Sequence, residues 1–170
     1  MNISGINFES VVDGEGVRVV IFVSGCLHNC KGCHNPTSHN FDNGRKLDDA
    51  LQNEVIDYIK QTPYISGLTL SGGDPMYSAE EIISFVETIK NDIESSTVWV
   101  YSGFKYEDIL KDSKMLSLLK ICDVLVDGEF ILEQRDTTLP YKGSRNQRII
   151  DIQKSMKEND IILWNGEVED

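Results

Sequence analysis

Residues 17–35 read VRVVIFVSGCLHNCKGCHN, a β-forming run that leads directly into a loop with three cysteines. The run Val17–Val23 is almost uninterrupted, which is typical of a strand buried on both faces of a parallel sheet. Cys26, Cys30 and Cys33 follow it with the spacing CxxxCxxC, so three of the four cysteines in the chain lie within eight residues. The sequence therefore predicts a buried strand with a chemically important loop at its carboxyl end.

The composition is that of an ordinary globular protein, with 170 residues, of which 40% are hydrophobic and 26% charged. A chain of this size buries a core without disulfides, and we expect a single domain over residues 1–170. We see neither a signal peptide nor an apolar stretch of membrane-spanning length, so we expect a cytoplasmic protein without membrane association. In a reducing compartment, clustered cysteines more often bind metal or act in catalysis than form disulfides.

The net charge is −12, from 28 acidic and 16 basic residues. This balance argues against a nucleic-acid binder, which needs a basic surface, and against docking on anionic lipid. It is compatible with a small-molecule substrate or with a protein partner that carries a basic patch. Maintaining solubility explains most of the charge equally well.

Strand and helix patterns alternate along the rest of the chain. Apolar residues at helical spacing predict helices over residues 48–61, which Pro63 ends, and 78–93, and one or two short helices over 106–119. A capping-box pattern starts at Ser78, and Ser113 is a plausible second cap. β-forming runs predict strands over residues 65–70, 97–101 and 122–126, with 149–150 and 161–163 as candidates for two more. We expect irregular connections over residues 36–46 and 130–146 and a frayed tail over 167–170.

This alternation predicts an α/β fold with a mostly parallel sheet. In such folds ligands gather at the carboxyl ends of the strands. We therefore expect one pocket on one rim, formed by the cysteine loop and residues 71–75, 101–103 and 127–129. The short chain favours an incomplete TIM-type barrel with helices outside, open on one side so that a large protein loop can enter.

Three thiolates suit a metal centre that keeps one open position. A cubane iron–sulfur cluster would bind the three loop cysteines and leave its fourth iron for an exogenous ligand. A zinc site would need a fourth ligand, with His28, His39 and Cys122 as candidates. The remaining alternative is a set of unliganded thiols. The spacing favours the cluster, because the second CxxC pair of many zinc sites is missing, and Cys122 opens an apolar strand, as core cysteines do.

Motifs on both sides of the loop give the chain a family resemblance. In chain order they are Asp13-Gly14-Glu15-Gly16-Val17-Arg18, the cysteine loop ending in His34-Asn35, and Ser71-Gly72-Gly73-Asp74-Pro75. This order resembles the radical S-adenosylmethionine (SAM) enzymes and, among them, the activating enzymes of glycyl-radical proteins. Gly32 and the segments 100–103 and 143–148 are most similar to the subfamily that activates anaerobic ribonucleoside-triphosphate reductase. The resemblance covers nearly the whole chain.

The resemblance implies a [4Fe-4S] cluster on Cys26, Cys30 and Cys33, with the amino and carboxylate groups of SAM on the open iron. An external one-electron reductant, such as flavodoxin, would drive cleavage of SAM to a 5′-deoxyadenosyl radical. That radical would remove a hydrogen atom from a glycine of the large subunit of the reductase, while the protein positions and shields the reactants. The nearest alternative is an activase of a different glycyl-radical enzyme. The alternative from another class is a non-catalytic zinc-binding adaptor protein.

The resemblance also implies which residues contact SAM, with no catalytic residue beyond the cluster. Gly72 and Gly73 would let the backbone approach the SAM amino group, and Asp74 would accept from the ammonium. Tyr101 and Ser102, at the end of the third strand, would contact the ribose or adenine; the equally favoured alternative is a buried aromatic with its hydroxyl satisfied within the protein. The cofactor-binding candidates are Gly32, Cys33, His34, Gly72, Gly73, Asp74, Tyr101 and Ser102.

Two residues depart from the wider superfamily. Gly32 replaces the aromatic residue that many members carry before the third cysteine, so the adenine contacts must be rearranged. Asp74 replaces the more frequent glutamate, and both changes are usual in the activating subfamily.

Several roles stay open at this point. Asp127 and Glu129 would orient substrate or face solvent, and solvent is favoured. For His28 and His34 we expect the backbone to matter more than the imidazoles, and we expect His39 at the surface. The segment 146–148, which would contact SAM or dock the partner, comprises Asn146, Gln147 and Arg148.

Overall fold

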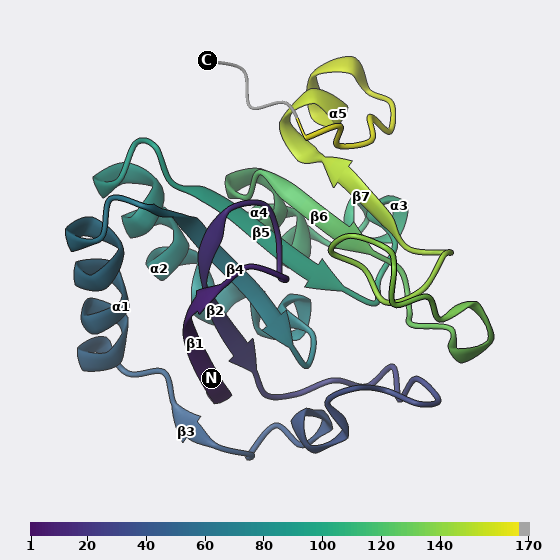
Figure 1. The fold of residues 1–170 in the computed structure, drawn as a ribbon, viewed down its shortest axis with the longest axis horizontal. Helices are drawn as coiled ribbons and strands as arrows, with labels where there is room; N and C mark the ends of the chain where they lie inside the picture. Colours follow the sequence, from purple (N-terminus) through teal and green to yellow (C-terminus); the bar gives the residue numbers. More distant parts are fainter. Residues whose placement is uncertain (167–170) are drawn as a thin grey trace.

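The structure is a computed structural model that describes residues 1–166. Within them seven strands form one sheet in the order β3-β1-β2-β4-β5-β6-β7 (Figure 1). The strands are β1 (Asn2–Ser10), β2 (Val17–Val23), β3 (Arg45–Lys46), β4 (Ile65–Gly72), β5 (Thr97–Ser102), β6 (Val124–Asp127) and β7 (Arg148–Asp151). The helices are η1 (Pro36–His39), α1 (Asp49–Gln61), η2 (Pro75–Ser78), α2 (Ala79–Asp92), α3 (Tyr106–Ile109), α4 (Ser113–Ile121), η3 (Leu132–Gln134) and α5 (Ile152–Glu158).

The centre of the sheet is parallel. The pairs β2–β4, β4–β5 and β5–β6 are parallel, whereas β1, β3 and β7 join antiparallel at the two sides. The predicted α/β class is therefore confirmed, and the sheet that was expected to be mostly parallel is a mixed, open one. The curvature of a partial TIM-type barrel stays a prediction.

One face of the sheet packs against helices. The cross-strand register places Ile21, Leu70, Val100 and Leu125 side by side on this face, and all four are fully buried. They share one core with apolar side chains of α1, α2, α4 and α5. Burial stabilises each such side chain by about 1.5–3 kcal/mol. This core holds the parallel strands in register, so their carboxyl ends lie at one edge.

The opposite face carries aromatic and polar side chains. The register places Trp99 beside Thr69 and Val124. The rings of Tyr141 and Trp164 cover Trp99, with centroids 5.4 and 5.0 Å from its own. Segments that follow β6 and α5 therefore cover this face of the sheet.

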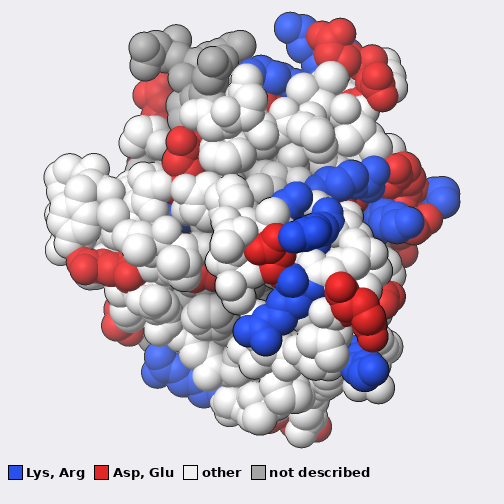
Figure 2. All heavy atoms as spheres, turned by 45° about the vertical axis from the view of Figure 1, so that its right-hand side comes forward, with Lys and Arg blue, Asp and Glu red and all other residues white. Residues whose placement is uncertain are grey.

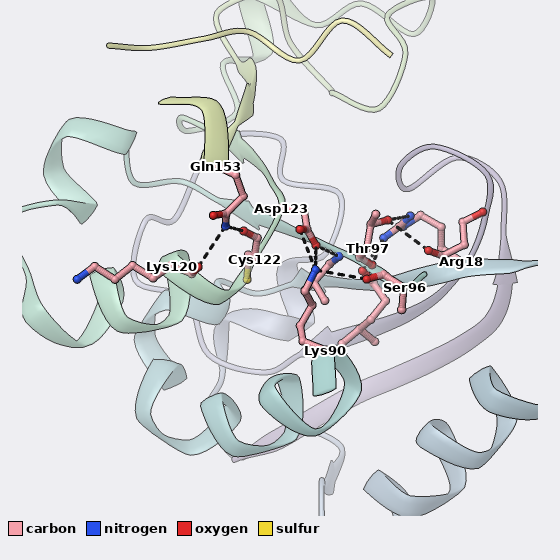
Figure 3. Close-up of polar contacts among 11 residues, drawn as sticks. Arg18, Lys90, Ser96, Thr97, Lys120, Cys122, Asp123 and Gln153 are labelled. Atoms are coloured by element: carbon pink, nitrogen blue, oxygen red, sulfur yellow. Dashed lines mark hydrogen bonds and ion pairs between the residues drawn. The ribbon is translucent and has the colours of Figure 1, made fainter. Parts of the chain in front are cut away.

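Arg18 is fully buried on this second face, near the amino end of β2 (Figure 3). Its guanidinium donates to the hydroxyls of Thr69 and Thr97 and to three backbone carbonyls at 2.7–3.0 Å, and all five acceptors are neutral. Burial lowers the pKa of Arg18 to about 10. One acceptor is the carbonyl of Glu15, and the Thr69 hydroxyl donates to the carbonyl of Asp13 at 2.8 Å. The family motif that ends at Arg18 therefore fixes a turn to the sheet.

A second polar group lies at the same end of the sheet (Figure 3). Lys90 Nζ donates to both carboxylate oxygens of Asp123 at 2.8 Å, and Asp123 also accepts from the amide of Val98 at 2.7 Å. Gln153 donates to the carbonyl of Cys122 at 2.7 Å. These contacts tie the start of β6 to α2, β5 and α5. The Cys122 side chain is fully buried in the core, as predicted.

One of the two predicted serine caps is at its predicted position: Ser78 is the N-cap residue of α2, whereas Ser113 is the first residue of α4 and not its cap. Ser78 precedes α2 but its side chain makes no capping hydrogen bond, because η2 leads directly into the helix. The cap of α4 is Asp112, whose carboxylate accepts from the amides of Lys114 and Met115. A carboxylate also caps α1, where Asp48 marks the predicted start of the helix.

Other differences lie at the ends of the chain and in its connections. β1 and α5 were not predicted, and the expected irregular stretch 36–46 contains η1 and β3. The candidate strand 161–163 makes only one isolated bridge, between Leu163 and Ile150. The predicted tail, 167–170, lies outside the described residues. Among the described helices none is long and apolar enough to span a membrane.

Candidate metal and cofactor site

A cavity of about 360 Å³ opens at the carboxyl ends of the parallel strands. The cysteine loop lines it together with Ser71–Gly73, Tyr101–Gly103 and Gly128. The prediction that these four segments meet at one rim is confirmed. A later segment, residues 139–147, completes the wall.

Cys26, Cys30 and Cys33 are free, half-buried thiols that line this cavity. Burial raises the pKa of Cys26 to about 11 and also raises that of Cys30, and the nearby Asp74 adds to the effect at Cys26. A bound metal's positive charge would stabilise the thiolates that burial disfavours. The donor set therefore fits a thiolate-bound metal group.

The arrangement of the donors distinguishes kinds of metal group. Among the described residues, no three His, Cys, Asp or Glu side chains converge as ligands of one metal ion. A [4Fe-4S] cluster spreads its irons, so each thiolate binds a different metal atom and no such convergence is needed. Cys122 is fully buried in the core, away from the cavity wall. Three cysteines on one loop therefore suit a cluster whose irons each take one thiolate.

Backbone hydrogen bonds fix the start of the cysteine loop. The Gly25 amide donates to the carbonyl of Ser38 at 2.7 Å, and the Gly25 carbonyl accepts from the amide of Asp74 at 2.9 Å. The Gly73 amide donates to the carbonyl of Val23 at 2.7 Å. A Cβ on Gly73 would lie 2.5 Å from the Gly25 oxygen and 3.0 Å from the Ser38 oxygen. Gly73 is therefore required for close contact between the loop and the turn after β4.

The middle of the loop needs left-handed backbone. Asn29 has φ 53° and Gly32 has φ 75°. A Cβ on Gly32 would lie 3.0 Å from a methyl carbon of Leu132. Glycine is therefore favoured at position 32 for local reasons: the backbone has a positive φ, and Leu132 leaves little space for a Cβ. Gly32 does not line the cavity, so its expected part in SAM binding stays a prediction.

Asp74 lies beneath the cavity wall and is 1% exposed. Its Oδ2 accepts from His28 Nε2 at 2.8 Å, from the Ser102 hydroxyl at 2.9 Å and from the Gly103 amide at 2.9 Å. Its Oδ1 accepts from the amide of Met76 at 2.9 Å. Asp74 does not line the cavity, and four protein donors already occupy its carboxylate. This geometry does not favour the expected contact with the SAM ammonium. Instead, Asp74 connects the cysteine loop and the end of β5 to the turn after β4.

The imidazole of His28 was not anticipated from the sequence. Nδ1 lies 3.3 Å from Glu129 Oε1, and Nε2 contacts Asp74. These carboxylates raise the pKa of His28, Asp74 most strongly, against the effect of burial. Glu129 does face solvent, as favoured, but also holds this ring. The sequence did offer a signal for this contact: His28 lies between two cysteines, and Asp74 follows the next predicted strand, 65–70.

The other two histidines differ from each other. His34 is exposed, lines the cavity and lies 5.4 Å from the Phe130 ring. His39 is half-buried and also lines the cavity, so it is only partly at the surface, where it was expected.

Tyr101 and Ser102 both line the cavity, but their hydroxyls are already engaged. The Tyr101 hydroxyl donates to the carbonyl of Tyr141 at 2.7 Å, and burial raises the pKa of Tyr101. The Ser102 hydroxyl donates to Asp74 and accepts from the amide of Phe104 at 3.1 Å. Contacts from these residues to ribose or adenine stay predictions.

Gly143 and Gln147, from the segment 143–148, line the cavity. Gln147 Oε1 accepts from the amides of Gly143 and Ser144, and its Nε2 donates to the carbonyl of Gly128 at 2.9 Å. Asn146 donates to the carbonyl of Glu129 at 2.8 Å. These side chains hold the segment against the end of β6.

Arg148, at the end of this segment, lies outside the cavity wall. It bridges Asp127, 2.9 Å from Oδ1, and Glu107. Its bond to Glu107 lowers the pKa of that carboxyl to about 2. Asp127 is 1% exposed, so the favoured solvent-facing position was wrong.

Positive and negative charges are interleaved on the surface that Figure 2 turns forward, where Lys and Arg adjoin Asp and Glu. Two ion pairs belong to the segments around the cavity. Lys31 lies 3.7 Å from Glu133, and Arg145 lies 2.9 Å from Asp136. The carboxylates of Glu133 and Asp136 are therefore each paired with a cation.

Comparisons with known proteins agree with this donor set. Residues 12–150 match the family model described as a 4Fe-4S single cluster domain. Three similar proteins share the printed name anaerobic ribonucleoside-triphosphate reductase-activating protein. They come from Haemophilus influenzae (42% identity, 82% of this chain and 90% of the relative), Enterobacteria phage T4 (40%, 81% and 86%) and Escherichia coli K12 (31%, 81% and 90%). Since both comparisons cover most of the chain, it belongs to the family of anaerobic ribonucleoside-triphosphate reductase-activating proteins and carries their 4Fe-4S single cluster domain.

Proposed function

We propose that this chain activates anaerobic ribonucleoside-triphosphate reductase by radical SAM chemistry. Cys26, Cys30 and Cys33 would hold one [4Fe-4S] cluster, and SAM would bind beside it in the cavity and complete its ligand set. When bound, the cluster and SAM supply a 5′-deoxyadenosyl radical that generates a glycyl radical on the large subunit of the reductase. The electron comes from an external one-electron donor such as flavodoxin.

One observation carries the proposal. Three free cysteines line the same 360 Å³ cavity as the glycine turn after β4 and the end of β5, in a chain whose relatives bear the activase name. The cavity walls would orient SAM and keep water from the reactive carbon, aided by the apolar side chains of Phe22, Phe130 and Leu139.

The open sheet supports the further proposal of an incomplete barrel, formed by one radical SAM domain, whose open side admits the glycine-bearing segment of the partner. Four free cysteines suit a reducing, cytoplasmic compartment.

The test is an anaerobic incubation of the reconstituted, reduced protein with SAM and the reductase. We expect the doublet of a glycyl radical in the EPR spectrum of the reductase. Omitting SAM serves as the control and should leave the spectrum without the doublet. A spectrum without it in the complete mixture would refute the proposal.

Two further measurements address the alternatives. Replacing the reductase with another glycyl-radical enzyme tests the partner, and a doublet only on the second enzyme would support the alternative activase. Metal analysis after anaerobic purification tests the adaptor alternative, because stoichiometric zinc without iron or sulfide would support it.

A further inference from the structure

The His28 ring contacts residues that follow three different strands, although His28 belongs to a surface loop. Its side chain is 9% exposed. Nε2 lies 2.8 Å from Asp74 at the end of β4, and Nδ1 lies 3.3 Å from Glu129, which follows β6. The Phe104 ring, which follows β5, contacts the imidazole edge-on at a centroid distance of 4.6 Å. One side chain of the cysteine loop therefore touches the ends of three parallel strands.

Gly103 packs closely against the ring. A Cβ on Gly103 would lie 2.5–2.8 Å from three atoms of the imidazole. Asp74 is held in turn by the Ser102 hydroxyl and by the Gly103 and Met76 amides. The carboxylate is therefore fixed before the imidazole reaches it. Since both ring nitrogens face carboxylates, the ring is not available as a metal ligand.

His28 lies between two of the three cysteines, so its contacts affect where their side chains lie. It lies two residues after Cys26 and two residues before Cys30. Other hydrogen bonds hold the two ends of the loop: Gly25 and Cys26 bond to Ser38, His39 and Asp74, and the Asn35 carbonyl accepts from Ser38. A ring fixed between the two cysteines restricts where both Sγ atoms lie.

We propose that His28 is a positioning residue, which fastens the loop between Cys26 and Cys30 to the ends of β4, β5 and β6 so that the thiols are arranged before a cluster binds. Metal sites depend on such support, because contacts behind the ligands orient them. The inference rests on the proposed function for what the thiols bind, but the fastening belongs to the protein without metal.

The first experiment measures hydrogen–deuterium exchange of the metal-free protein. In His28→Ala we expect peptides over residues 24–35 to exchange roughly tenfold faster, as for loss of about one charge-assisted hydrogen bond. Peptides over α2 should exchange as in the wild type, which separates local loosening from unfolding. His28→Gln retains an N–H donor for Asp74, and we expect it to restore much of the protection.

The second experiment uses Gly103→Ala, which displaces the ring without removing it. It should loosen the same loop, whereas adding it to His28→Ala should have little further effect. Such non-additivity is expected when two changes act through one contact. Gly5→Ala is the matched control, because a Cβ there has no heavy atom within 4 Å.

Reconstitution with iron and sulfide gives a readout besides activity. We expect His28→Ala to bind less iron and sulfide and to show a broadened or diminished EPR signal after reduction, with His28→Gln closer to the wild type. Wild-type loop exchange and cluster signal in His28→Ala would overturn the inference. The inference would also be overturned if Gly103→Ala speeds exchange over residues 24–35 by the same factor in the wild type and in His28→Ala. If the glycyl radical is absent but the loop loosens as described, the proposed function fails while the positioning role stands.

Discussion

Replacing Gly73 with alanine tests whether the turn after β4 and the cysteine loop depend on close backbone contact. The new Cβ would lie 2.5 Å from the Gly25 oxygen and 3.0 Å from the Ser38 oxygen. Both are backbone atoms, so no side-chain rotation relieves the contact. The loop must move, and the bonds from Asp74 N to Gly25 O and from Gly25 N to Ser38 O would lengthen.

The expected cost follows from these contacts. Overpacking a rigid site costs about 1–3 kcal/mol, and one weakened hydrogen bond adds about 1 kcal/mol. The sum is about 2–4 kcal/mol, which for a protein of this size lowers Tm by roughly 4–16 °C. Because the cysteine loop is displaced, we also expect less iron to bind on reconstitution.

The assay is thermal unfolding of the metal-free protein followed by circular dichroism, with iron analysis after reconstitution. Gly5→Ala is the control, because it makes the same change in the unfolded chain without a close contact. Equal Tm values and equal iron contents for the two variants would show that this reasoning about the loop is wrong.

Three further predictions concern other parts of the molecule. Cys30→Ser should abolish SAM cleavage while leaving the circular dichroism spectrum unchanged, and wild-type turnover would show that this ligand is misassigned. Arg18→Leu should lower the unfolding free energy by about 3 kcal/mol or more in urea, since carbonyls of Leu68 and Thr97 lose their buried donor; a loss below 1 kcal/mol would contradict this. Glu107, with its pKa lowered from 4.5 to about 2 by Arg148, contributes stability above pH 4.5 that is lost as the pH falls towards 2. Glu107→Gln should flatten acid unfolding in that range, and an unchanged profile would count against the pair.

The sequence predicts the centre of this fold well. Val17–Val23 is a strand as predicted, because its continuous apolar pattern matches a strand covered on both faces. Strand and helix alternation then places the ligand-binding loops at one edge, since parallel strands end together. β1 was missed because it pairs with β2 through an irregular register, in a stretch containing Gly5. α5 has only seven residues, too few for a periodic pattern to stand out.

The polar parts of the site could not be predicted in the same way. The cysteine spacing identifies the metal-binding loop without any three-dimensional information. The partners of His28 lie 46 and 101 positions away in the sequence. Those of Arg148 lie 21 and 41 positions away. No local pattern encodes such pairs. Gly73 likewise reads as an ordinary turn residue until the neighbouring Gly25 carbonyl is in view.

The most direct test of the central claim is the EPR spectrum of the reduced, reconstituted protein before and after addition of SAM. If three cysteines hold a [4Fe-4S] cluster with an open iron in this cavity, the spectrum should show a reduced cluster whose g-values shift when SAM is added. A cluster signal that SAM leaves unchanged, or a protein that binds no iron at all, would contradict the account.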